Sequence, residues 1–83
     1  QDVPPFIIAA EHPLIYKGIN LIGLKRRGFS SEERQSIKKI YKLYFKSGLN
    51  RGDALNEIQT EIKSSTVKSQ IVEFIKASDR GII

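Results

Sequence analysis

The sequence predicts a mostly helical fold, in which a three-helix bundle follows a few short β segments. Two patterns predict the helices, namely capping residues ahead of each one and apolar residues that recur every three or four positions. A third pattern predicts extended structure near the start, where β-branched and aromatic residues form short runs broken by proline and glycine. With 83 residues, the chain makes one small domain at most.

The chain before residue 25 alternates between turns and β-type runs. Pro4 and Pro5 fix φ and lack N–H donors, so they predict a turn. The apolar run Phe6–Ala10 has the length of a buried strand, and Leu14–Leu24 has the β-branched and aromatic content of further short strands. Because strands this short do not make a stable sheet alone, we expect them to need a neighbour that this sequence does not contain, with pairing to each other as the alternative.

Each of the three predicted helices follows a capping residue. Ser30 caps the first, Glu33 completes a capping box, and Gly48 ends this helix in the left-handed conformation. Asn50 caps the second helix, and Ser64–Thr66 caps the third. The apolar stripes are Ile37, Ile40, Tyr41, Tyr44 and Phe45; Ala54, Leu55, Ile58 and Ile62; and Val67, Ile71, Phe74 and Ile75. Short loops between amphipathic helices predict an antiparallel bundle, with the aromatic residues in its core.

The positive charge of the chain is concentrated in one segment. The net charge is +5, and residues 25–46 alone carry +6, from eight Lys and Arg against two Glu. Such an excess favours an anionic partner: a phosphate, an acidic protein, a membrane surface or nucleic acid. There is no cysteine, which excludes disulfides and thiolate metal sites, and no apolar run approaches the roughly 20 residues of a membrane span.

The cluster Lys25–Gly28 is the strongest candidate for a binding site. An Arg guanidinium matches two phosphate oxygens, a Lys adds a mobile charge, and Gly28 lets the backbone turn. The helix that begins after Ser30 is expected to add free N–H groups and a positive dipole end. Together these features predict a phosphate or diphosphate site. The alternative is a solvated basic turn, because three basic residues in a row are common.

Asn20 and His12 are further polar candidates for a site. Asn20 has an amide that donates and accepts at once, as a base or sugar edge requires, although turn chemistry after a glycine is the alternative. His12, the single histidine, lacks a partner at a diagnostic spacing, so we expect a surface turn rather than a general base. With no second His or Cys to share an ion, we expect no metal site.

Several stretches resemble a known family. They are Gln1–Phe6, Gly18–Ser30, Tyr41–Leu43, Ser47–Leu49 and Ala77–Ile82, which span nearly the whole chain. The core Gly-Leu-Lys-Arg-Arg-Gly-Phe-Ser is the most specific part. The sequence resembles the C-terminal portion of the acyl-carrier-protein-dependent UDP-N-acetylglucosamine O-acyltransferases, which open lipid A synthesis. Since the chain begins at Gln1 rather than Met, we expect a fragment or a processed chain.

The resemblance implies a fold and an activity. It implies a left-handed parallel β-helix followed by a helical domain, so that 1–24 are terminal β-helix strands and a loop, and 25–83 are the C-terminal helical domain. It implies a cytoplasmic homotrimer that moves an (R)-3-hydroxyacyl group from acyl carrier protein to the 3-hydroxyl of UDP-N-acetylglucosamine, without metal or organic cofactor. The family's catalytic His lies upstream, so this chain is expected to hold no catalytic residue and to be inactive alone.

The resemblance also implies roles for individual residues. Asn20 and Arg26 match the positions that contact the nucleotide, and Arg27 is the next candidate, for the diphosphate or for acyl carrier protein. Some members carry Glu where this chain has Ile22, which puts one nucleotide contact in doubt. The lysines predicted to dock the acidic carrier are Lys25, Lys38 and Lys42, with a solvated face as the alternative.

Two other functions are compatible with the charge pattern. The first is a small basic helical module that binds nucleic acid, whose affinity would fall steeply with salt. The second is a structural or trimerising segment with no ligand of its own. The resemblance favours neither of them.

Overall fold

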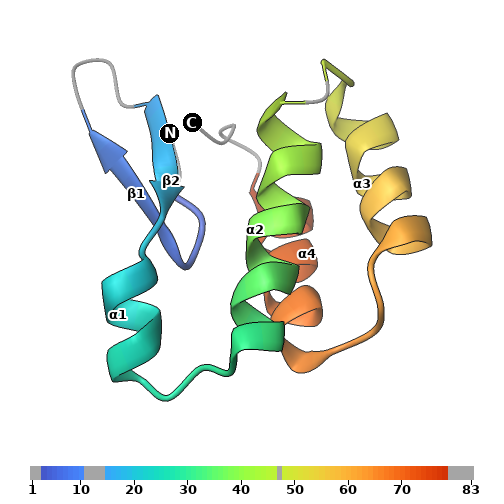
Figure 1. Cartoon of the computed structure of the whole chain (residues 1–83). Coiled ribbons are helices and arrows are strands. Elements are labelled where there is room, and N and C mark those ends of the chain that lie inside the picture. The colour runs from blue at the N-terminus through green and yellow to red at the C-terminus, as the bar shows by residue number, and fades with distance from the viewer. Residues whose placement is uncertain (1–2, 11–14, 47, 79–83) are drawn as a thin grey trace.

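The computed structural model describes residues 3–10, 15–46 and 48–78. Along the chain, a β-hairpin is followed by a short helix and then by three longer helices. The elements are β1 (Ile7–Ala10), β2 (Ile15–Ile19), α1 (Leu21–Arg26), α2 (Ser31–Lys46), α3 (Arg51–Glu61) and α4 (Thr66–Ala77). The hairpin and α1 lie on one side of α2, and α3 lies on the other (Figure 1). The predicted class, mostly helical with short β segments at the start, is confirmed.

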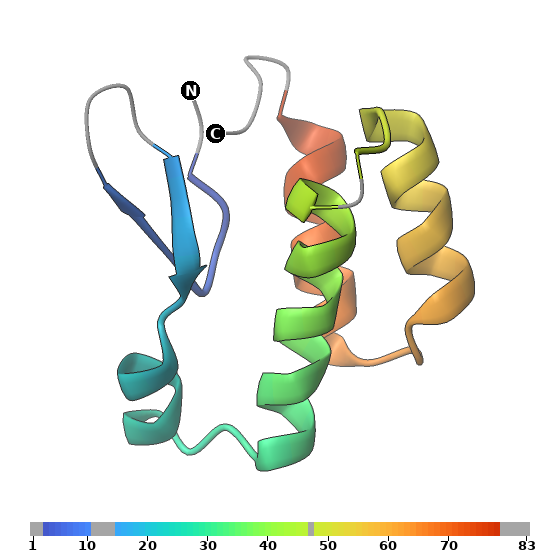
Figure 2. The same ribbon diagram turned by 45° about the horizontal axis from the view of Figure 1, so that its top comes forward.

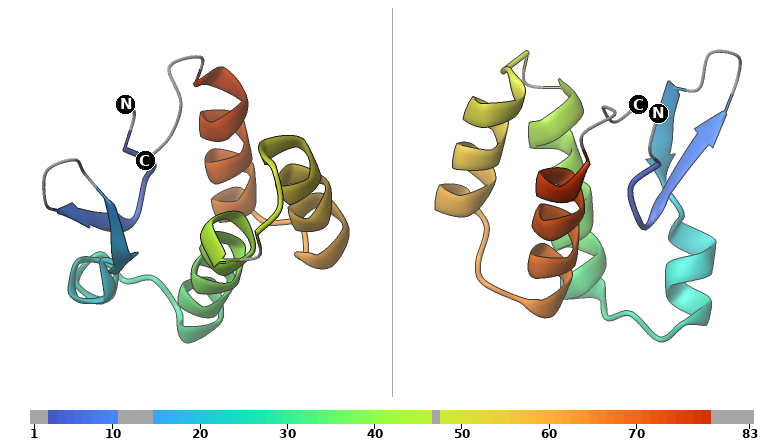
Figure 3. Two further views of the ribbon diagram at one scale, coloured as in Figure 1. Left: turned by 90° about the horizontal axis from the view of Figure 1, so that it is seen from above. Right: turned by 180° about the vertical axis from the view of Figure 1, so that it is seen from behind.

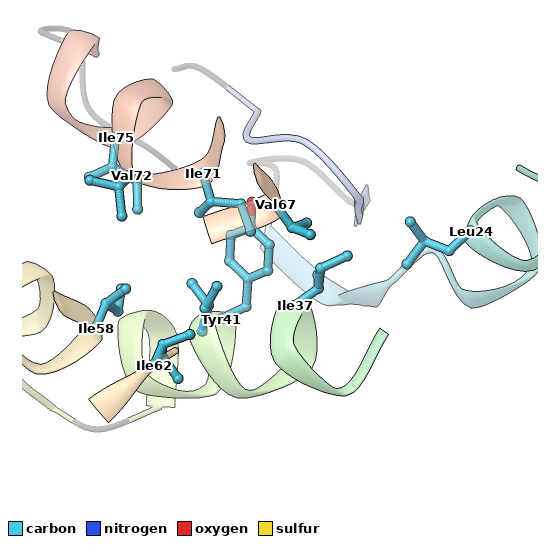
Figure 4. Packing of buried hydrophobic residues seen from close by; sticks show 10 residues of the cluster. Leu24, Ile37, Tyr41, Ile58, Ile62, Val67, Ile71, Val72 and Ile75 are labelled. Atoms are coloured by element: carbon cyan, nitrogen blue, oxygen red, sulfur yellow. The ribbon is translucent and has the colours of Figure 1, made fainter. Parts of the chain in front are cut away.

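The helices α2, α3 and α4 form the predicted antiparallel bundle. Each runs opposite to the one before it (Figure 1), and seen from above they occupy the corners of a triangle (Figure 3). Their facing side chains make the core shown in Figure 4. The buried members from the predicted stripes are Ile37, Ile40, Tyr41, Ala54, Ile58, Ile62, Val67, Ile71 and Ile75, while Tyr44, Phe45, Leu55 and Phe74 are half-buried. The periodicity therefore identified the core faces of α2, α3 and α4.

The predicted caps are present. Ser30 and Glu33 exchange two hydrogen bonds, of 2.8 and 3.0 Å, which is the reciprocal pattern of a capping box. The side chains of Asn50 and Ser65 accept backbone N–H groups in the first turns of α3 and α4, at 2.9 and 3.1 Å. Gly48 has a φ of 76°, the left-handed conformation expected after α2. Local sequence therefore fixes where these helices begin.

The two strands pair with each other. β1 and β2 are antiparallel, with an irregularity in register between Ile8 and Ala9. The hairpin packs on α2 through Tyr16, whose ring stacks on Phe45 at 4.5 Å between centroids and lies 6.1 Å from Tyr41. The expectation that these strands need a neighbour outside the sequence is therefore wrong. A two-stranded sheet is marginal alone, and here a helix of the same chain supplies the packing surface.

The expectation of extended structure as far as Leu24 is also wrong. The chain leaves β2 at Ile19 and turns directly into α1 (Figure 2). The side-chain oxygen of Asn20 caps this helix by accepting the N–H of Gly23 at 3.2 Å, and Leu24 is buried against the bundle. Burial of Leu24 outweighs the β-type composition around it. The predicted boundary between residues 24 and 25 falls within α1, and the division into two domains stays a prediction.

Candidate functional site

The basic cluster lies at the carboxyl end of α1. Gly28 adopts a φ of 79°, its N–H donates to the carbonyl of Lys25 at 3.1 Å, and the N–H of Phe29 donates to Leu24 at 3.0 Å. These two bonds form a Schellman motif, which ends the helix and satisfies its last carbonyls. Cations at this end complement the helix dipole, so Lys25 and Arg26 are compatible with the fold even without a ligand.

The capping box changes what the amino end of α2 offers to an anion. The capping box already occupies the N–H groups of Ser30 and Glu33, and Glu32 and Glu33 place negative charge in the first turn. Arg34 turns back and donates to the carbonyl of Phe29 at 2.6 Å, which braces the link to α1. Two of the N–H groups expected to bind an anion are therefore occupied, and the basic side chains become the stronger candidates at this junction.

Asn20 and Arg26 stand at opposite ends of α1. Asn20 is the N-cap and Arg26 is the last helical residue, and both are exposed. Six residues of helix rise separate them by about 9 Å along the axis. The cap uses the Asn20 amide oxygen, so this oxygen has a structural role at the start of α1. A Cβ at Gly23 would lie 2.7 Å from the Asn20 amide nitrogen, which explains a glycine there.

Arg27 lies over a pair of aromatic rings. Its guanidinium carbon is 5.1 Å from the ring centre of Phe29 and 5.8 Å from that of Phe6. The two rings meet edge to face, with centroids 5.4 Å apart. Cation–π attraction holds a guanidinium in place while leaving its N–H donors free for an oxyanion. Sequence reasoning missed both phenylalanines, although Phe29 lies only two positions from Arg27. Phe6 could not be found from spacing, because it is 21 positions from Arg27 along the chain.

The predicted docking lysines border a shallow hollow between α1 and α2. The hollow has a volume of about 320 Å³ and is lined by Ile19, Leu21, Ser31, Arg34, Gln35 and Lys38. Lys42 is exposed one turn beyond Lys38 on α2, and Lys25 is exposed one turn beyond Leu21 on α1. Lys38 thus lines the hollow together with Leu21, which is 43% exposed, and Lys25 and Lys42 each lie one helical turn from a lining residue.

Some predicted features lie outside the described residues. These are His12, with the turn around it, and residues 79–82 of the closing motif. In the described ranges, no helix is long and apolar enough to cross a membrane. Within the same ranges, no group of three or more His, Cys, Asp and Glu is placed to hold a metal ion.

The chain is similar to known proteins along its whole length. A family model described as UDP N-acetylglucosamine O-acyltransferase, domain 2, matches residues 2–83. Acyl-[acyl-carrier-protein]–UDP-N-acetylglucosamine O-acyltransferase of Fusobacterium nucleatum is 45% identical over 82 residues, which is 99% of this chain and 32% of that protein. The Janthinobacterium protein of the same description is 47% identical over 87 residues, covering 100% of this chain and 33% of its own length.

Solved structures agree with these sequence matches. The UDP-N-acetylglucosamine acyltransferase of Bacteroides fragilis superposes with a TM-score of 0.93 and 49% identity, over 96% of this chain and 31% of that one. The Francisella novicida enzyme gives a TM-score of 0.89 and 38% identity, over 99% and 30%. The chain thus spans about a third of the length of the relatives it matches. Because the family model matches residues 2–83, the chain belongs to the UDP-N-acetylglucosamine O-acyltransferase family.

Proposed function

We propose that this chain binds a nucleotide sugar and helps to dock a carrier protein within an acyltransferase. The full-length protein would move an (R)-3-hydroxyacyl group from acyl carrier protein to the 3-hydroxyl of UDP-N-acetylglucosamine, the first step of lipid A synthesis. The observation that carries the proposal is a solvent-exposed α1, with Asn20 at one end and Arg26 at the other, in a chain that matches this family over residues 2–83.

The two ends of α1 would contact different parts of an elongated sugar nucleotide. The amide of Asn20 would hydrogen-bond a base or ribose edge, and the guanidinium groups of Arg26 and Arg27 would bind diphosphate oxygens in their planar forks. These contacts would position the sugar hydroxyl against the thioester of the carrier. The support is the exposure of Asn20 and Arg26 at two ends of one short helix.

The bond-making step would use a histidine from outside this chain. That residue would take the proton of the sugar 3-hydroxyl as the oxygen attacks the thioester carbonyl, and the carrier thiolate would leave and accept a proton. A new ester C–O bond replaces the C–S bond, with no oxidant, metal or organic cofactor involved. The 83-residue chain alone would therefore be inactive, and the full-length protein would act as a cytoplasmic homotrimer.

The basic surface beside the hollow would attract acyl carrier protein. Lys25, Lys38 and Lys42 are exposed, and they lie in the segment that carries all of the net positive charge. Complementary charge raises association rates more than final affinity, and salt weakens it. The partly exposed Leu21 offers an apolar contact within the same surface. The nucleic-acid-binding alternative is not favoured, because the family assignment accounts for the basic cluster without it.

The test is Arg26→Ala in the full-length protein, measured by steady-state kinetics. Loss of a charge-assisted contact should raise KM for UDP-N-acetylglucosamine by about tenfold or more, with KM for the acyl carrier substrate unchanged. Lys63→Ala is the matched control, since it removes one exposed positive charge from the loop before α4 and should leave KM within about twofold. An unchanged KM for the UDP-sugar in Arg26→Ala would refute the proposed role.

A further inference from the structure

The turn at Pro5 and Phe6 connects three parts of the molecule. The carbonyl of Pro5 accepts a 2.7 Å hydrogen bond from the hydroxyl of Tyr41, which is fully buried in α2. The carbonyl of Phe6 accepts the backbone N–H of Asn20 at 2.7 Å, at the start of α1. The ring of Phe6 contacts the other end of α1, where it lies against Phe29 and Arg27. One residue therefore holds both ends of this helix.

The backbone of Phe6 indicates that its position is imposed by the surrounding structure. Its φ is 70°, in the left-handed region that a bulky side chain rarely adopts. Such a conformation persists where neighbouring contacts over-determine it. The contacts are the hydrogen bonds to Tyr41 and Asn20 on its two sides and the edge-to-face packing on Phe29. Phe6 is thus fixed in a place that serves α1.

We infer that Phe6 is a positioning residue for the sugar nucleotide, acting through Arg27. The rings of Phe6 and Phe29 restrict the Arg27 guanidinium to one location, 5.8 and 5.1 Å from their centres, so that less rotamer freedom is lost when a diphosphate binds. The inference rests on the proposed function of the junction. It extends that function to a residue 19 positions or more from the cluster, which reaches it through the tertiary fold alone.

The experiment measures KM for UDP-N-acetylglucosamine and for the acyl carrier substrate in Phe6→Leu, Phe6→Tyr and Arg27→Ala forms of the full-length protein. Phe6→Leu keeps an apolar side chain but removes the ring, so KM for the UDP-sugar should rise about two- to fivefold while kcat changes little. Phe6→Tyr keeps the ring and should retain the original KM. The variant Phe6→Leu/Arg27→Ala should be no worse than Arg27→Ala, because the ring acts through that arginine.

The matched control is Phe74→Leu, the same substitution at a half-buried phenylalanine of α4. It loses similar packing and should leave both KM values unchanged. If Phe6→Leu fails to fold, Phe29→Leu replaces it, since that ring is the nearer of the two to Arg27. If Asn20→Ala, Arg26→Ala and Arg27→Ala each left KM for the UDP-sugar unchanged, the proposed function of the junction would be refuted.

Other outcomes would overturn the inference about Phe6 alone. In the first, Arg27→Ala raises KM for the UDP-sugar but Phe6→Leu does not. In the second, the two substitutions raise this KM additively in the double variant. An increase confined to KM for the acyl carrier substrate, or an equal effect of Phe74→Leu, would overturn it as well. The inference is supported if Phe6→Leu raises KM for the UDP-sugar, Phe6→Tyr does not, and Phe6→Leu adds no further increase in the Arg27→Ala background.

Discussion

Tyr41 joins the hairpin region to the bundle through a single buried hydroxyl. Its side chain is 0% exposed, and the hydroxyl donates to the carbonyl of Pro5 at 2.7 Å. Burial raises the pKa of the Tyr41 phenol well above its usual range, and the neighbouring Tyr16 raises this pKa further. The neutral form is therefore the one that the fold accepts, since a phenolate here would lose both its solvation and its donor hydrogen.

This pKa predicts a loss of stability at alkaline pH. The folded state holds the Tyr41 proton more tightly than the unfolded state, whose tyrosine pKa is about 10. The free energy of unfolding should therefore fall as the pH rises above about 10. Tyr41→Phe should cost about 1 kcal/mol at neutral pH, from the lost hydrogen bond, and should show a shallower decline.

Urea unfolding of the chain at about pH 8 and about pH 11 checks this prediction, because the interval spans the ordinary tyrosine pKa. The stability gap between the original chain and Tyr41→Phe should narrow across the interval. Tyr16 and Tyr44, whose pKa values burial also raises, leave a residual slope in both proteins. If the difference in free energy of unfolding between the two proteins were the same at both pH values, Tyr41 would not be the cause of the decline.

At the scale of elements, α3 and α4 cap each other. The ammonium of Lys68, 7% exposed, donates to the carbonyls of Gln59 and Ile62 at the end of α3, at 3.2 and 2.7 Å. In return, the guanidinium of Arg51 in α3 donates to the carbonyl of Ile75 at the end of α4. The exchange is possible because antiparallel neighbours place the start of one helix beside the end of the other, where a cation complements the dipole.

Lys68→Met should show how much this cap contributes to the free energy of unfolding. Methionine fills similar space but leaves the two carbonyls without their donor, so the free energy of unfolding should fall by about 1–3 kcal/mol. Urea denaturation gives the measurement. Lys39→Met is the matched control, since Lys39 is exposed within α2, and the change there should stay within about 0.5 kcal/mol. Equal effects of the two substitutions would mean that the buried ammonium contributes nothing specific.

The whole molecule presents its charge unevenly. The segment of 25–46 carries a net +6 and runs through the last part of α1 and all of α2, while 47–83 is neutral overall. The hairpin and α1 lie on one side of α2, and α3 lies on the other (Figure 1). Arg34 and Lys38 of the basic segment line the hollow beside α1. A field of this kind steers an acidic partner toward that side.

Removing two of these charges should slow association with acyl carrier protein. In the full-length protein, Lys38→Gln/Lys42→Gln should lower the association rate by about fivefold at low salt, and less at high salt, where the Debye length is short. Stopped-flow binding over a salt series measures this effect. Lys63→Gln/Lys76→Gln removes the same charge from exposed positions outside the basic segment and serves as the control. If both double variants lowered the association rate equally, the effect would come from net charge and not from this surface.

Helix boundaries and core faces were predictable from the amino-acid order, because they depend on neighbours within four positions. The Ser30–Glu33 box, the Asn50 cap and the apolar stripes are interactions of this kind, and the structure contains each of them. The family was likewise predictable from the contiguous motif Gly18–Ser30, and the match of the family model to residues 2–83 confirms it. The exposed positions of Asn20 and Arg26 are compatible with the roles predicted for them.

Contacts between distant segments decided the rest. β1 pairs with β2, and the helix that begins at Leu21 buries Leu24 in the core, which the composition around those residues does not encode. The hydrogen bond from Tyr41 to Pro5 spans 36 positions, and the ring of Phe6 reaches Arg27 only because the hairpin and α1 fold back together. Local preference is worth less than a buried contact, so the tertiary fold overrides it where the two disagree.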